Sequence, residues 1–258
     1  MAPVEPPLVD LLCRRAHSVI DVAARVRLFR GILAVTARDE LRATLDRLAE
    51  RAGLRDTQAQ VALLTAEIAL CWEPDLQRAV HGDRLDAPAS ALDPTDERLV
   101  PDYGRGRVLT LGERKSLARR PDRRLIDRVL RDPHPDVIEM LLMNPRLTEP
   151  DVVRLCARRP NAPEILLRVF RSPRWAIRPK VRAALALNPS TPPAIAEAVV
   201  PLLAPEDLHA LAQDDHAADV VRRRCIEVLS RFAPLHDDPG ARGALTAAHR
   251  GVQPRTGS

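Results

Sequence analysis

The sequence repeats itself between residues 117 and 189, and this repetition restricts the folds that the chain can adopt. The segment 128–133 reads RVLRDP and returns 40 residues later as RVFRSP. LLMNP at 141–145 returns 44 residues later as LALNP, and ARRP at 118–121 returns 39 residues later. Periods of 20 to 50 residues built from helical phrases are typical of stacked units. We therefore expect an all-α protein that contains an α-solenoid of short helical repeats.

The composition supports helices and argues against β-sandwiches and barrels. Aromatic residues make up only 2% of the chain, whereas 45% of its residues are apolar. Sandwich and barrel cores favour aromatic and β-branched side chains, so a core of Leu, Val, Ile and Ala fits packed helices better. No segment alternates apolar and polar residues with the period of a strand.

The positions of Gly and Pro residues divide the 258 residues into four regions. Residues 1–81 are predicted to form a small N-terminal bundle of three or four helices. Residues 82–106, rich in Gly and Pro, are predicted to be a linker or loop. Residues 107–233 carry the repeats, including a fainter third unit near 219–229, and residues 234–258 are predicted to be a flexible tail.

Several residues predict where individual helices begin and end. Gly53 is expected to end a helix and Asp56 to cap the next one. Thr110 and Glu113 have the spacing of a capping box, and Thr36 with Asp39 has a weaker version of it. Further predictions concern a buried helical face (Val61, Leu64 and Ile68) and prolines at helix starts (Pro121, Pro145, Pro160 and Pro189).

The Asn-Pro phrases resemble a known repeat family. LALNPSTPPAIA at 185–196 and LMNPRLTEPDVV at 142–153 are similar to the unit of the leucine-rich repeat variant family, a branch of the HEAT-like α-solenoids. The resemblance covers roughly residues 115–230 and implies stacked helices in a curved array. The spacings between the prolines are unequal, and the cysteine cluster that holds an iron–sulfur centre in some members is missing. The resemblance therefore implies a fold, without a cofactor, a metal or an active site.

Positive charge is concentrated in the repeats. Residues 107–182 contain 19 Lys or Arg and nine Asp or Glu, a net charge of +10, whereas the whole chain carries +5. Basic positions recur between the units, and Arg128 and Arg131 leave Val129 and Leu130 free to face the core. Because equivalent positions of stacked repeats line up, we predict a ladder of guanidinium groups for an anionic partner. The candidate binding residues are Arg119, Arg120, Arg128, Arg131, Arg158, Arg159, Arg168 and Arg171.

Three interpretations of these arginines remain open. They can form a solvated helix face in an Arg-rich chain, partly neutralised by the acidic N-terminal region. They can bind a protein partner with an acidic surface, which would make the chain a non-catalytic interaction module. Alternatively, they can bind nucleic acid, as in the HEAT-like alkylpurine DNA glycosylases of DNA repair, although Trp175 has no acidic neighbour nearer than Glu164.

The sequence carries no signature of an enzyme. It contains no glycine-rich phosphate loop, nucleophile elbow or zinc-ligand spacing. Cys13, Cys71, Cys156 and Cys225 are scattered through apolar sequence, so we expect buried, reduced thiols and a cytoplasmic location. The first residues do not resemble a signal peptide, and no apolar run has the length of a membrane span.

Overall fold

The computed structural model describes residues 7–86, 93–94, 96–215 and 217–231, and these residues form helices and turns without a β-strand. The predicted all-α class is thereby confirmed. The N-terminal helices are α1 (Pro7–Ser18), α2 (Val22–Ala34), α3 (Arg38–Gly53), α4 (Thr57–Leu70) and α5 (Pro74–His81). None of the helices in the described part of the chain is long and apolar enough to cross a membrane.

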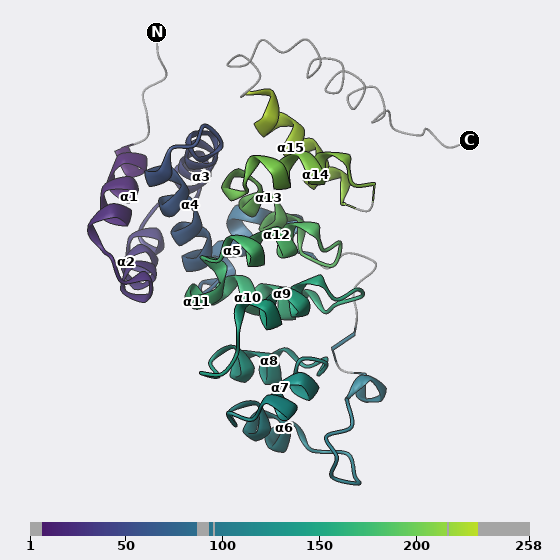
Figure 1. Ribbon diagram of the computed structural model, residues 1–258. Coiled ribbons are helices and arrows are strands. Elements are labelled where there is room, and N and C mark those ends of the chain that lie inside the picture. Colours follow the sequence, from purple (N-terminus) through teal and green to yellow (C-terminus); the bar gives the residue numbers. More distant parts are fainter. Residues whose placement is uncertain (1–6, 87–92, 95, 216, 232–258) are drawn as a thin grey trace.

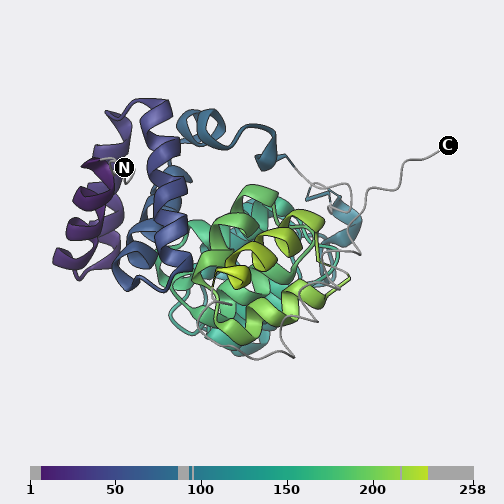
Figure 2. The same cartoon turned by 90° about the horizontal axis from the view of Figure 1, so that it is seen from above.

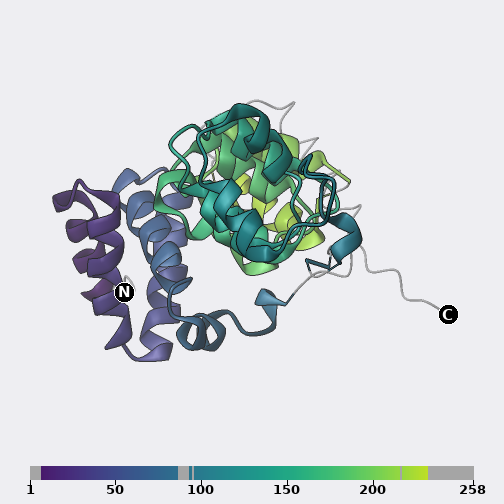
Figure 3. The same ribbon diagram turned by 90° about the horizontal axis from the view of Figure 1, so that it is seen from below.

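The remaining helices follow one another along a second body, which we call the helix stack (Figure 1). They are α6 (Leu111–Ala118), α7 (Arg123–Val129), α8 (Pro135–Leu142), α9 (Glu149–Ala157), α10 (Pro163–Arg171), α11 (Pro173–Ala176), α12 (Pro179–Leu187), α13 (Pro193–Val199), α14 (Pro205–Gln213) and α15 (Asp219–Ser230). Short 3₁₀ helices are η1 (Gly82–Leu85), η2 (Glu97–Leu99) and η3 (Val200–Leu202). Viewed along the stack, the N-terminal helices lie to one side of it (Figures 2 and 3).

A buried asparagine makes the same contact twice in the stack. The Nδ2 group of Asn144, directly after α8, donates to the carbonyl oxygens of Ala118 and Arg120 at 2.8 and 2.9 Å. The Nδ2 group of Asn188, directly after α12, donates to the carbonyl oxygens of Cys156 and Arg158 at 2.6 and 2.8 Å. These carbonyls lie at the ends of α6 and α9, where a helix leaves its last acceptors unpaired. Each Asn-Pro turn therefore holds the end of an earlier helix.

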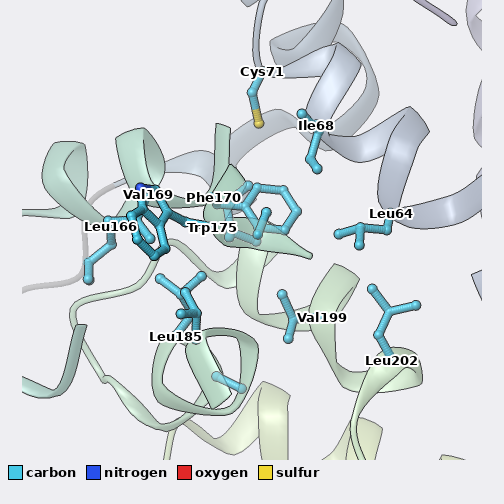
Figure 4. Close-up of a cluster of buried hydrophobic side chains, with 14 of the residues drawn as sticks. Leu64, Ile68, Cys71, Leu166, Val169, Phe170, Trp175, Leu185, Val199 and Leu202 are labelled. Carbon is cyan, nitrogen blue, oxygen red and sulfur yellow. The ribbon is translucent and has the colours of Figure 1, made fainter. Parts of the chain in front are cut away.

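Helix α4 is the centre of the contact between the N-terminal helices and the stack. Its residues from Ala62 to Leu70 are all buried, so no face of its second half is left for solvent. In Figure 4, Leu64, Ile68 and the nearby Cys71 lie opposite Phe170, Val199 and Leu202 of the stack. The two bodies thus share one apolar core.

Polar contacts from α2, α10 and η1 border this core. The Arg171 guanidinium lies 3.7 Å from the centroid of the Trp72 ring, and Arg30 bonds Glu73 at 2.7 Å. Arg84 of η1 reaches Glu197 of α13 at 2.9 Å. A cation over an indole face stabilises the contact by about 0.5–2 kcal/mol, more where water is excluded.

Several local predictions are confirmed. Helix α3 ends at Gly53, and the Asp56 side chain accepts from the amides of Gln58 and Ala59 at the start of α4. Thr110 and Glu113 form a reciprocal capping box at α6. All four cysteines are free and buried.

Other local predictions are wrong. Val61 is 37% exposed, because its side of α4 faces the surface beside α2 instead of the core. Thr36 does not cap α3, since Ala37 holds the N-cap position and the Thr36 hydroxyl donates to the Ile32 carbonyl.

The four proposed prolines lie in turns ahead of the helices. The residues that begin helices α8, α10, α12, α13 and α14 are Pro135, Pro163, Pro179, Pro193 and Pro205. Helices α7, α9, α10 and α13 begin two to four residues after Pro121, Pro145, Pro160 and Pro189, so these prolines mark turns and are not the first helical residues.

Replacing Asn188 with Ala is expected to lower the free energy of unfolding by about 2–4 kcal/mol. The change leaves two carbonyls and the amide of Ser190, which bonds Asn188 Oδ1 at 2.9 Å, without partners in a buried turn. Urea unfolding followed by circular dichroism measures the difference. The exposed amide of Gln213 provides the control, because Q213A removes a side chain without a buried bond. A loss below about 0.5 kcal/mol for N188A would contradict the assigned role.

Candidate anion-binding groove

Three of the eight predicted arginines meet at one hollow of the stack, which we call the basic groove. Arg128, Arg131 and Arg158 line a space of about 530 Å³ together with Leu99, Pro101 and Asp102. The lining thus contains three guanidinium groups and one carboxylate. Because like charges in one hollow repel each other, an anionic ligand would lower the electrostatic energy of this groove.

The end of α7 sets the direction of Arg128 and Arg131. Val129 and Leu130 are buried against the core, and the arginines before and after them, Arg128 and Arg131, are exposed. This arrangement is the one that their spacing predicts. Neither arginine forms an ion pair with another of the residues that the structure describes.

Arg158 enters the groove from the turn after α9. Its Nη1 donates to the Arg131 carbonyl oxygen at 2.9 Å, which fixes the guanidinium beside the end of α7. Burial lowers the pKa of Arg158, while the nearby Asp132 raises it. The side chain is therefore held in place before any partner arrives.

The opposite wall of the groove is the segment 99–104, which leads into the stack. Tyr103 anchors it: its hydroxyl donates to the Asp132 carboxylate at 2.6 Å, and Arg114 bonds the same carboxylate at 2.9 and 3.0 Å. Burial and the Asp132 charge raise the pKa of Tyr103. Since Asp132 is fully buried, both partners compensate for the cost of removing its charge from water.

Gly104 brings this wall close to Arg128. It has a φ of 70°, and a Cβ at this position would collide with the Arg128 guanidinium. The side chain of Asp102 accepts from the Gly104 amide at 2.6 Å, which closes a tight turn. The segment therefore lies against the Arg128 guanidinium at the basic groove.

The equivalent arginines of the second unit have a different environment. Arg168 bonds Glu139 at 3.1 Å and Asp136 at 3.4 Å, and Arg171 bonds Glu139 at 3.3 Å. Both are only partly exposed and are paired with α8, so the structure does not display a continuous row of unpaired guanidinium groups through α10. The physical reason is that α8 packs beside α10 and supplies the carboxylates of Asp136 and Glu139. Helix α7, by contrast, has the segment 99–102 beside its arginines.

The other three candidates lie on the turns that the asparagines hold. Arg119 is exposed and its Nη2 lies 3.0 Å from the Met140 sulfur, and Arg120 is exposed. Arg159 donates to the Leu187 carbonyl at 2.6 Å. The structure therefore does not bring these three into the basic groove with Arg128, Arg131 and Arg158.

No sequence pattern indicates the other half of the basic groove. Leu99, Pro101 and Asp102 belong to the segment 82–106 that is predicted to be a linker or loop, and no motif in the sequence singles out Tyr103. The signal that could have indicated this contact is the lone Tyr beside a Gly-rich turn, because a buried tyrosine hydroxyl requires a partner.

A second cavity lies between the N-terminal helices and the end of the stack. It has a volume of about 390 Å³ and is lined by residues of α3, α4, α5, α13 and α15, among them Glu67, His81 and Glu197. His81 Nε2 lies 3.0 Å from a Glu67 carboxylate oxygen, and both side chains are buried. The Nδ1 atom of His81 is buried and makes no hydrogen bond within the described part of the chain.

The charges around His81 determine its protonation. Burial by itself lowers its pKa, but the charge and hydrogen bond of Glu67 outweigh this, and the net pKa is raised. Arg84 acts to lower it and Glu197 to raise it. No group of three or more potential metal ligands occurs among the residues described.

Comparison with known proteins adds no assignment: no protein-family model, no curated protein and no solved structure matches the chain. The function therefore has to be inferred from the geometry of the chain itself.

Replacing Glu67 with Gln is expected to destabilise the protein more at about pH 6 than at about pH 9. Because the folded pKa of His81 is raised above 6.5, the ion pair stabilises fully below that pH and is lost as the pH rises through the folded pKa. The expected loss at about pH 6 is roughly 1–3 kcal/mol. Urea unfolding of the parent and of E67Q at both pH values measures it.

The exposed Glu40 provides the control, since E40Q removes the same charge from a surface position. A difference between the parent and E67Q that stays constant with pH would show that His81 does not titrate against Glu67.

Proposed function

We propose that the protein is a non-catalytic interaction module, in which an α-solenoid binds an acidic segment of a protein partner through the basic groove. The observation that carries the proposal is the convergence of Arg128, Arg131 and Arg158 on one hollow, in which Asp102 supplies the one carboxylate among the described lining residues. Arginine forms bidentate bonds with carboxylates, which suits aspartate and glutamate side chains.

The order of the helices supports the solenoid. We group them as α6–α7–α8, α9–α10–α12 and α13–α14–α15, so that corresponding helices of successive groups begin 38 to 44 residues apart. The equivalent bonds of Asn144 and Asn188 support this grouping, since both join the third helix of a group to the end of its first. Repeats of this kind build extended binding surfaces.

The apolar groups in the basic groove favour a protein partner. Leu99 and Pro101 line it beside the arginines, and they offer contacts to the aliphatic part of a peptide. A peptide that alternates acidic and small apolar residues would form ion pairs with the arginines and apolar contacts with Leu99 and Pro101.

Nucleic acid remains the alternative partner, and it is less well supported. A duplex presents phosphates along its whole length, and proteins match them with several separated cations. Arg168 and Arg171 are already paired with α8, which interrupts such a track. Single-strand binding uses exposed aromatic platforms, and Trp175 is buried with its Nε1 bonded to the Leu142 carbonyl.

The test is fluorescence anisotropy with a labelled glutamate-rich peptide and with labelled duplex DNA, at about 50 and about 200 mM salt. The parent is expected to bind the peptide, and R128E/R131E is expected to weaken binding about tenfold or more, since two attractive charges become repulsive. Asp102→Asn is expected to strengthen binding, because it removes the negative charge of a residue that lines the basic groove.

The matched control is R14E/R27E, which makes the same change of charge at two exposed positions of α1 and α2. Equal loss in both double variants would indicate only an effect of net charge. Binding of DNA in place of the peptide would support the alternative, and absence of binding to both probes at low salt would contradict the proposal.

A further inference from the structure

A third cavity lies on the other side of the contact between α4 and the stack. It has a volume of about 290 Å³, and it is bordered by α2 and α4 on one side and by α11, α12 and η3 on the other. A neighbouring hollow of about 290 Å³ shares Arg25 and Val61 with it and continues towards Ile20. Small-molecule sites commonly have volumes of this order.

The walls of this cavity are mainly apolar. Val22, Val61 and Leu64 come from the N-terminal helices, and Ile177 and Leu202 come from the stack. Figure 4 shows Leu64 and Leu202 near each other at this contact. Val61 is 37% exposed and Ile20 is 92% exposed, so apolar surface extends from the cavity to the outside.

Two arginines enter the same cavity. Arg25 is held by Thr65 through Nε at 3.0 Å and by the carbonyls of Ala16 and Val19 through Nη1. Arg182 is held by the carbonyls of Ala176 and Ile177 through Nη1. Each guanidinium is therefore positioned by main-chain and hydroxyl oxygens, which are neutral.

The positive charge of these arginines is not balanced. Neither forms an ion pair with any residue of the described ranges, and the Nε atom of Arg182 is buried without a hydrogen-bond partner. Burial lowers the pKa of both arginines, and only Asp21, which caps α2, acts on Arg25 in the opposite direction. Both side chains are partly buried, and removing a cation from water is costly unless an anion is near, so the cavity is electrostatically complementary to a bound anion.

We propose that this cavity binds a small amphiphilic carboxylate, with its head group between Arg25 and Arg182 and its apolar chain along Val22, Val61 and Leu64. The charged end and the apolar walls together select this class over a purely polar anion such as phosphate or a neutral alcohol. Because both bodies of the protein line the cavity, the ligand would also fasten the N-terminal helices to the stack.

The test uses octanoate as the probe, with isothermal titration calorimetry and thermal unfolding of the full chain. Octanoate is expected to bind and to raise the unfolding midpoint, as a ligand of the native state does. Octanol and inorganic phosphate are expected to bind at least tenfold more weakly. Equal binding of octanol and octanoate would overturn the role of the arginines, and absence of octanoate binding would overturn the site.

Two variants localise the effect. R182Q removes one of the two charges and is expected to weaken octanoate binding at least fivefold. Since R182Q could disturb the fold, V61D provides an independent variant, because it adds a repelling carboxylate at a partly exposed position and is expected to weaken binding tenfold or more. V61N has nearly the same shape without the charge and is expected to retain most of the affinity; an equal loss in V61D and V61N would contradict the proposal.

This site is independent of the basic groove. R128E/R131E is expected to bind octanoate like the parent, and V61D is expected to bind the acidic peptide like the parent. If one of the two ligands fails to bind, binding of the other can therefore still be measured.

Discussion

Pairing of main-chain carbonyls at the helix ends is the constraint on which the stack depends. The helices are short, so a large share of their carbonyls lies in the last turn, where no following amide is available. Asn144 and Asn188 supply two donors each, from turns that lie 24 to 32 residues further along the chain. Each asparagine side chain thus pairs the last carbonyls of an earlier helix and sets the distance between that helix and its own. This gives successive helices a regular spacing.

Arginines at matching positions of the repeats have different neighbours, so they differ in the ion pairs that they form. Arg128 and Arg168 occupy matching positions, but α8 places Asp136 and Glu139 beside the second and no helix of the stack offers carboxylates to the first. Instead, the segment anchored by Tyr103 lies beside Arg128. Consequently, the same repeated arginine forms ion pairs with a neighbouring helix in the middle of the stack, whereas in the first helices of the stack it can bind a partner.

The contact between the two bodies borders two of the cavities that lie beside α4. The hollow on the α5 side contains carboxylates and arginines that largely pair with each other, such as Arg84 with Glu197. The hollow on the α2 side contains two arginines without a carboxylate, which makes it the one suited to an anion.

The sequence by itself determined the local features: the helical class, the end of α3 at Gly53, the caps at Asp56 and Thr110, and the outward direction of Arg128 and Arg131. These depend on interactions within about four residues, and residue type and spacing specify them. The pairing of Arg168 with Glu139, the exposure of Val61 and the meeting of Arg25 with Arg182 were decided only by the tertiary structure. Each of these involves side chains from helices that are distant in sequence, and their distances follow from how the helices pack, which no local pattern records.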